Sequence, residues 1–504
     1  MSPRPADISG PSLRSLAPLR TPLRCKTLSV FSTPTARIIG MHPYNDSRQA
    51  SLQAHFIVIG GGIAGLAVAY VLANAGHHVR VIEKRGLGEP AGGLRVPPNL
   101  SKILRKWVGA DELKRTAVRC VGSPFLDLAT DSRVGYIHWK PAVMEETGGE
   151  FLMMHHEDVH RMLYDLAVGA GADVLLDTSV VAIHPGTDAL PNPSVSLSNG
   201  QVLTADFLIG ADGPNSRVRE VVLGEDDDAE PGGTTVYVAS VPASEMRADP
   251  TLREFVRTDE WPIWMGANRS MCGHYIRATN EFNITLFMHK NDPDAQSGEE
   301  GWEDVILSSG LDQSQHGSSV QKLLKLAPKL VRTRFMRRPE GVPEWIDQTG
   351  RIVLIGEAAH PWFPCGTHGA SMAVEDAVVL GRLFSNLRSW SQVPSFLSAF
   401  QELRQARCDA VLESDVANAR LVALPPGPMA DARNADMHRQ LDDWDEGALK
   451  ENFEAIAEIF GYDAGDAADE WWVDWGRFGN KLDEGGPGVH LVNFDVQVVA
   501  VETE

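Results

Sequence analysis

The stretch HFIVIGGGIAGLAVAYVLANAGHHVRVIEK, residues 55–84, decides the fold of this chain. It opens with a short apolar run, residues 56–59, and such a run is typical of a parallel strand buried on both faces. Three glycines and an apolar helical stretch follow. A second apolar run, residues 79–82, ends on the acid Glu83. The stretch therefore predicts a strand, a tight turn, a helix and a second parallel strand.

The three glycines are spaced as in a turn that holds a phosphate. Gly60 permits the tight turn, Gly62 lets the main chain approach a pyrophosphate, and Gly65 lets the helix pack close to the strand. The helix N-terminus adds free N–H groups and the positive end of its dipole. Glu83 can accept hydrogen bonds from ribose hydroxyls and would repel the 2′-phosphate of NADP. Residues 55–84 therefore predict a site for adenosine diphosphate, which NAD and FAD share.

Two later stretches have the same design, a buried strand that ends in a turn of small residues. The first is ADFLIGADGPNSRVRE, residues 205–220, in which Asp212 and Gly213 follow the strand. The second is RIVLIGEAAHPWFPCGTHGASMAVEDAVVLGRLF, residues 351–384, in which Glu357 follows the strand. Open α/β sheets bind ligands at the carboxyl ends of their strands. Three such turns therefore predict one extended ligand that is contacted at several points.

Together these motifs resemble the FAD-dependent aromatic monooxygenases, the single-component flavoprotein hydroxylases, and among them the fungal salicylate-hydroxylase-like branch. The resemblance covers residues 55–421, with the three motifs in the family's order. Similar stretches between them are AGGLRVPPNL at 91–100, HHEDVHRMLYDLA at 155–167 and FQELRQARCDAVLESDVAN at 400–418. The resemblance implies an α/β fold: a discontinuous Rossmann-like FAD-binding domain carrying GxGxxG, an inserted mixed β-sheet substrate domain, and a helical C-terminal region.

The resemblance also implies an order of domains. We expect a disordered N-terminal extension at 1–54, the first part of the FAD-binding domain at 55–231, the substrate-binding sheet at 232–345, the second part with a long helix at 346–424, and an acidic region at 425–504.

Several classes of partner are disfavoured by composition. The formal net charge of −21 argues against nucleic acid and anionic membrane surfaces as partners. No apolar run reaches the roughly 18 residues of a membrane span. The five cysteines are far apart and form no CxxC or Cys/His spacing, so we expect no metal site and a cytoplasmic location. Residues 1–50 are arginine-rich and weakly transit-peptide-like, but their prolines would break an amphipathic helix, which favours disorder.

Residue by residue, the resemblance implies contacts along the whole cofactor. The ADP half would lie on the glycine turn and Glu83. The ribityl chain would lie beside His156, the Gly356–Glu357 turn along the ribityl chain and pyrophosphate, and residues 366–370 near the isoalloxazine ring. The implied FAD-binding residues are Gly60, Gly62, Gly65, Glu83, Gly93, His156, Asp212, Gly213, Glu357, Pro364, Gly366, Gly369 and Ala370.

Three positions depart from the family's pattern. Glu357 stands where an aspartate is usual, and His156 stands where an arginine is common. His368 stands where a glutamine is usual in the loop near the flavin ring. A histidine there can donate a hydrogen bond to the flavin, or it can simply pack.

Substrate recognition is expected on the inserted sheet. Tyr275 is the first candidate for orienting or deprotonating a phenolic substrate, and His274 is the second. Only one of them can serve, because neighbouring side chains on a strand point to opposite faces. Many fungal relatives carry an arginine where this chain has Val238, so an anionic substrate group would need Arg277 or Arg269 instead.

The expected function is a monooxygenase that uses FAD, O2 and either NADPH or NADH. It would hydroxylate a phenolic or other electron-rich aromatic through a flavin hydroperoxide, with or without oxidative decarboxylation. The alternatives are an epoxidase of secondary metabolism acting on an indole or alkene, a non-enzymatic GDI-like carrier, and a plain NAD dehydrogenase. The tryptophans at 471–475 are read either as core packing or as a homodimer contact.

Overall fold

The computed structural model describes residues 48–87, 92–187, 189–292, 300–302, 304–442 and 457–476. Residues 1–47 of the expected N-terminal extension lie outside this part of the chain, as do 443–456 and 477–504 of the expected acidic region. Within the part described, no helix combines the length and the apolar character needed to cross a bilayer.

A parallel sheet of five strands forms around the sequence stretch that opens at residue 55. The strand order is β19-β12-β1-β2-β8, and each neighbouring pair is parallel. The strands are β1 (His55–Ile59), β2 (His78–Ile82), β8 (Asp173–Leu175), β12 (Phe207–Gly210) and β19 (Ile352–Leu354). The three strand-and-turn motifs of the sequence therefore lie on adjacent strands, and their turns leave the same edge.

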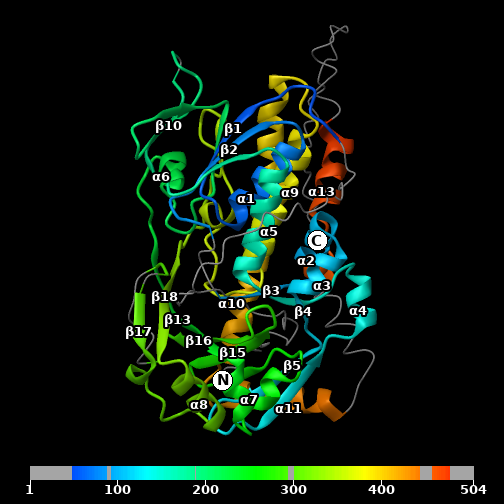
Figure 1. Ribbon diagram of the computed structural model, residues 1–504, viewed down its shortest axis with the longest axis vertical. Helices are drawn as coiled ribbons and strands as arrows, with labels where there is room; N and C mark the ends of the chain where they lie inside the picture. The colour runs from blue at the N-terminus through cyan, green and yellow to red at the C-terminus, as the bar shows by residue number, and fades with distance from the viewer. Residues whose placement is uncertain are drawn as a thin grey trace, which may run out of the picture.

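Long helices cover this sheet, as Figure 1 shows in its upper half. Helix α1 packs against α5 and α9, and α9 in turn packs against α10 and α13. Because α1 is contacted from several sides, its apolar residues are spread around the helix and not confined to one stripe. The bounds are α1 (Ile63–Asn74), α5 (His156–Gly169), α9 (Gly369–Phe384), α10 (Val393–Val422) and α13 (Ala464–Trp471).

Smaller elements flank the parallel sheet. One three-stranded sheet contains β3 (Gly93–Val96), β4 (Val118–Arg119) and β7 (Leu152–His155). Another contains β9 (Val180–His184), β10 (Ser194–Leu197) and β11 (Val202–Thr204). The shorter helices are α2 (Pro98–Val108), α3 (Ala110–Thr116), α4 (Pro141–Glu146) and α6 (Arg217–Leu223). Helix α11 (Pro428–Asp442) instead packs against the strand at 133–138, which belongs to the larger sheet.

A mixed sheet of eight strands forms the other half of the molecule, in the lower part of Figure 1. Its order is β17-β18-β13-β16-β15-β14-β5-β6, and β14 pairs with β5 in parallel while the other neighbours are antiparallel. Two of its strands precede residue 232, so the sheet also draws on the stretch expected to bind FAD. The strands are β5 (Gly122–Asp127), β6 (Arg133–His138), β13 (Glu230–Pro242), β14 (Ile263–Gly266), β15 (Arg269–Ile276), β16 (Glu281–His289), β17 (Asp304–Leu307) and β18 (Lys329–Arg337).

The two faces of this sheet belong to different cores. Phe282 and Trp264 lie in a cluster that includes residues of α7 (Ala243–Ala248) and α8 (Ser318–Leu326). Val238 and Phe287 belong to the main core, which also contains the helices around the parallel sheet. We call the Val238 face the inner face of the sheet.

Candidate functional site

The turns after three neighbouring strands touch one another. A side-chain carbon added at Gly60 would lie 2.3 Å from the carbonyl oxygen of Ala211, which precedes the second motif's Asp212. A side-chain carbon added at Gly356 would lie 2.7 Å from Cβ of Ala64, in the first turn of α1. The three turns therefore form one surface, which suits an extended ligand.

The glycine turn leaves space where a phosphate would lie. Gly60 has φ of +103°, a conformation that favours glycine, and Gly65 lies so close that an added Cβ would be 1.9 Å from the Gly60 oxygen. At Gly62, by contrast, an added Cβ would have no atom within 4 Å. Gly62 caps α1 without a side-chain hydrogen bond, so the first N–H groups of the helix are offered to a ligand.

The acid at the end of β2 is oriented by the same turn. Glu83 accepts hydrogen bonds from the N–H of Gly61 at 2.7 Å and from the N–H of Arg85 at 2.8 Å. The carbonyl of Gly61 is paired in turn with Nε2 of His160 at 2.7 Å. An ionised carboxylate has about four lone-pair positions, so Glu83 retains capacity for hydroxyl groups.

The second motif is held rigidly and is tied to the third. Asp212 accepts from the Ser216 hydroxyl at 2.5 Å and from the Arg217 N–H at 2.8 Å, and the Ser216 oxygen caps α6 by accepting from the Arg219 N–H. Burial raises the pKa of Asp212, and the bond from Ser216 acts against that rise. Buried Arg219 donates to the carbonyls of Glu357 at 3.3 Å and of Ala358 at 3.0 Å. The guanidinium thus links the two turns.

Asp415, on α10, organises the loop that leads to α9. It accepts hydrogen bonds from Trp362 Nε1 and from the His368 N–H, both at 2.9 Å, and its second oxygen is 2.9 Å from His368 Nδ1. A side-chain carbon at Gly366 would lie 2.7 Å from the same carboxylate. The His368 ring is fully buried between Asp415 and Phe460. Nothing in the sequence singled out Asp415.

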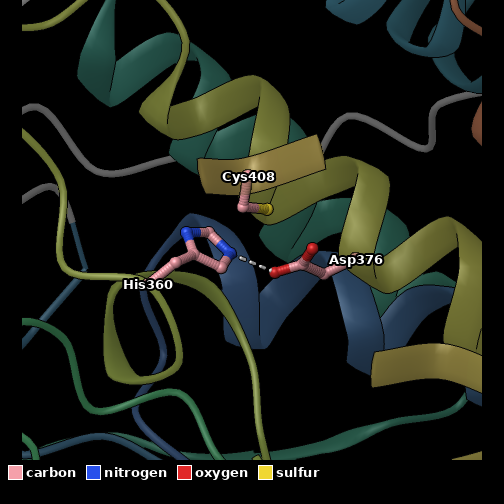
Figure 2. Close-up of side chains that lie close together, drawn as sticks. All are labelled: His360, Asp376 and Cys408. Carbon is pink, nitrogen blue, oxygen red and sulfur yellow. Dashed lines mark hydrogen bonds and ion pairs between the residues drawn. The ribbon is translucent and has the colours of Figure 1, made fainter. Parts of the chain in front are cut away.

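A buried cluster of charges joins this loop to the helices, and Figure 2 shows part of it. Asp376 accepts from the Gly356 N–H at 2.9 Å and from His360 Nε2 at 2.6 Å. Its other oxygen accepts from Arg404 Nε at 2.8 Å. Burial opposes the charge on His360, yet Cys408 and Asp376 beside it raise its pKa well above the usual value.

His360, Asp376 and Cys408 place three possible metal-ligand atoms within 4.8 Å of one another. Two of them already accept from an N–H donor: the Arg404 guanidinium contacts both Asp376 and Cys408, the latter at 3.6 Å, and the His360 ring is paired with Asp376. A cation would have to displace these bonds and lie against a buried guanidinium. The cluster is better described as a hydrogen-bonded support for the Gly356 turn.

Comparison with known proteins identifies the family of this chain. The profile of the FAD binding domain family matches residues 53–415, more than two thirds of the chain. The chain belongs to the FAD-dependent aromatic monooxygenase family. The resemblance seen in the sequence is thereby confirmed, and so is the α/β fold with its mixed sheet and C-terminal helices.

Individual relatives agree. The chain is 27% identical over 412 residues to the FAD-dependent monooxygenase OpS4 of Beauveria bassiana (strain ARSEF 2860), a match that covers 77% of this chain and 90% of that protein. It is 30% identical over 328 residues to 3-hydroxybenzoate 6-hydroxylase of Klebsiella oxytoca, a match that covers 65% of this chain and 78% of that protein. A salicylate hydroxylase substrate complex has the same fold, with a TM-score of 0.65 and 21% identity over 83% of this chain and 97% of that one.

Two other expected FAD contacts lie on the side of β3 and α5. Gly93 faces the large sheet, where an added Cβ would lie 2.3 Å from His274 Nε2. His156 begins α5, and its N–H donates to the Gly92 carbonyl at 2.8 Å. At the ring loop, Pro364 and Gly366 are buried, whereas the first α9 residues, Gly369 and Ala370, are partly exposed. Gly93 and His156 therefore lie close together where β3 and α5 meet, and their contact with FAD stays a prediction.

The structure places the two substrate candidates on opposite faces of the large sheet. Tyr275 packs on the cluster of the outer face, and its hydroxyl is hydrogen-bonded to Arg247 and Asn280, each at 3.1 Å. It points away from the ring loop, so a substrate role for Tyr275 is not supported. His274 lies on the opposite face and is fully buried, and burial lowers its pKa well below the usual value, with Arg95 adding to the effect.

Arg269 and Arg277, which were expected to pair with an anionic substrate group, form ion pairs within the protein instead. Arg269 is paired with buried Asp292 at 2.6 Å, and Arg277 is exposed beside Asp259. Sequence reasoning missed Arg95, a buried arginine on β3.

Arg95 lies between the sheet and the ring loop. It donates to Cys272 Sγ at 3.2 Å and to the Cys365 carbonyl at 3.3 Å, and it lies 4.6 Å above the Trp261 ring. Because Cys272 belongs to the inner-face core and Cys365 to the loop, Arg95 supplies positive charge where the two halves meet.

The unusual acid Glu357 gives a test of the site's electrostatics. Burial raises the pKa of Glu357 from 4.5 to about 7, and the negative charge of Glu300 adds to this rise. As the pH rises, the unfolded chain therefore loses the Glu357 proton at a lower pH than the folded chain. The stability that neutral Glu357 contributes is complete below pH 4.5 and is lost as the pH rises through 7. The free energy of unfolding of Glu357→Gln, relative to that of the native protein, should therefore be about 1–3 kcal/mol higher at pH 8 than at pH 5. Urea unfolding of flavin-free protein at both pH values measures the gain, and an equal difference at both would show that the carboxyl is already ionised at pH 5.

Proposed function

We propose that this protein is a monooxygenase that consumes NADPH or NADH and inserts one atom of O2 into a phenolic or other electron-rich aromatic ring. The second oxygen atom leaves as water. Two relatives are named for hydroxybenzoate substrates, 3-hydroxybenzoate and salicylate, and this supports a phenol for this chain. The observation that carries the proposal is that three strand-end turns meet in one surface. Arg95, held between the sheet and the ring loop, adds a positive charge for an anionic substrate group.

The chain's own residues fit FAD. Gly62 and the α1 N-terminus would hold the pyrophosphate, and Glu83 the ribose of the ADP half. Helix α9 begins after His368, and no side chain caps its N-terminus. Its first N–H groups and its dipole can therefore stabilise negative charge on a reduced flavin ring. FAD, when bound, accepts the hydride and activates O2. The GxGxxG half and the ring-loop half, 55–231 and 346–424, would together form the cofactor domain.

The substrate would bind between the inner face and the ring loop. Arg95 would pair with a phenolate or a ring carboxylate, and its fork of N–H groups suits either anion. His274, on the same face as Cys272, remains a candidate for a second polar contact. Phe363 of the loop packs against Phe287 at 5.8 Å and Phe335 at 5.1 Å, which excludes water from the junction.

The test starts with the visible spectrum of the purified protein, which should be yellow. NADPH and NADH oxidation is then measured with phenols, with hydroxybenzoates and with matched neutral rings. We expect stimulation by some phenols, one labelled atom from ¹⁸O2 in the product, and release of CO2 only if decarboxylation accompanies oxidation. Arg95→Gln should raise KM for anionic substrates by about tenfold or more, and less for neutral ones. A colourless protein would favour the carrier alternative, and an alkene epoxide as product would favour the epoxidase.

A further inference from the structure

The segment 457–476 follows the family match, which ends at residue 415, and its sequence showed no chemical motif. We propose that residues 459–462 of this segment form the rear wall of the flavin-ring loop and position His368 and the start of α9 against the flavin. The proposal rests on the FAD binding established above. Phe460 is its central residue and acts through His368, so it is a positioning residue.

Phe460 closes a row of aromatic rings that begins at the loop. Its side chain is fully buried, with ring centroids 5.8 Å from His368 and 6.2 Å from both Trp139 and Phe151. Phe151 in turn stacks on Trp261 at 5.9 Å, and Trp261 lies beneath Arg95. One contiguous layer therefore runs from the appended segment, past the ring loop, to the arginine at the junction with the sheet.

The neighbours of Phe460 in sequence anchor it to the support of the cofactor site. The Gly461 carbonyl accepts from Lys102 Nζ at 2.8 Å, and the Ile459 carbonyl accepts from Arg407 at 3.0 Å. The Arg407 guanidinium lies 3.8 Å from the ring centroid of Tyr462, a cation–π contact. Arg407 also donates to buried Glu375 on α9 at 2.8 Å. The segment is thus bound to the charge cluster that holds the Gly356 turn.

This placement has a physical consequence for the flavin. Asp415 fixes the loop with three hydrogen bonds, one from Trp362 and two shared with His368, and Phe460 covers the His368 ring. A smaller side chain at 460 leaves a void next to the His368–Asp415 pair, because buried sites collapse only partly. The ring of His368 can then turn or take up water, and the loop is no longer held in one position. Flavin affinity and the flavin's spectrum should both register that change.

The experiment compares Phe460→Leu with Phe396→Leu in the flavin-loaded protein. Phe396 is equally buried but packs on Phe384, Trp471 and Trp472, away from the ring loop. Free FAD fluorescence on serial dilution gives the dissociation constant, and the visible spectrum reports the surroundings of the bound ring. Both variants should melt at a lower temperature than the native protein. Only Phe460→Leu should raise Kd for FAD, by about tenfold, and shift the flavin bands.

Native affinity and an unshifted spectrum in Phe460→Leu would overturn the proposal and leave the segment a packing element. If Phe460→Leu fails to fold, Lys102→Met replaces it in the experiment, because it removes the hydrogen bond to the Gly461 carbonyl. We then expect Kd for FAD to rise by about threefold. An unchanged Kd would overturn the proposal. Failure of FAD binding itself is a separate result, because the native protein would then also be colourless.

Discussion

Replacing Arg404 with leucine is expected to lower the free energy of unfolding by about 3–5 kcal/mol. The guanidinium is fully buried and contacts two carboxylates of α9, Glu375 at 2.8 Å and Asp376 at 2.8 Å. Burial alone would raise the pKa of Asp376, but His360 and Arg404 hold it at about 2. Without Arg404 both acids would lose a buried partner, and neither has solvent to replace it.

Urea unfolding at pH 7 measures this loss. The matched control is Arg80→Leu, because Arg80 pairs with Asp173 at 2.7 Å but both side chains are about half exposed. Such a surface pair contributes at most about 1 kcal/mol. Arg404→Leu should also lose FAD, since the Gly356 N–H depends on Asp376. Equal losses in the two variants would mean that solvent reaches the cluster and screens its charges.

Gly62→Ala and Gly65→Ala should fail in different ways, although the two glycines belong to one motif. At Gly65 the new carbon would lie 1.9 Å from the Gly60 oxygen, a backbone atom, so the helix cannot begin where it does. We expect poor folding and no bound flavin. At Gly62 the new carbon meets nothing within 4 Å, and φ of −75° suits alanine. Gly62→Ala should fold normally yet bind FAD at least about a hundredfold more weakly, because its methyl lies where the pyrophosphate approaches.

Two measurements separate these outcomes. The melting temperature of flavin-free protein should match the native value for Gly62→Ala and fall for Gly65→Ala. The ratio of flavin absorbance to protein absorbance after purification should fall for both. A yellow, fully loaded Gly62→Ala protein would place the pyrophosphate elsewhere and would remove the main support for the ADP site.

The sequence by itself determined the strands and turns of the adenosine diphosphate site. This was possible because those features are local: an apolar run of four or five residues, glycines at fixed spacing, and an acid at the end of the next strand. The strands expected at 56–59 and 79–82 are observed as β1 and β2, and the strand expected before Asp212 is observed as β12. Their parallel pairing and shared edge follow from the same pattern, since such runs must be buried on both faces.

Only the tertiary structure decided which side chains meet at that edge. Strand β15 is buried on both faces, so polarity could not show whether Tyr275 or His274 faces inward. Asp415 and Phe460 reach His368 from 47 and 92 residues away in the chain, and Arg95 meets Cys272 across 177. Contacts at such separations depend on how helices and sheets pack, and no local spacing encodes them.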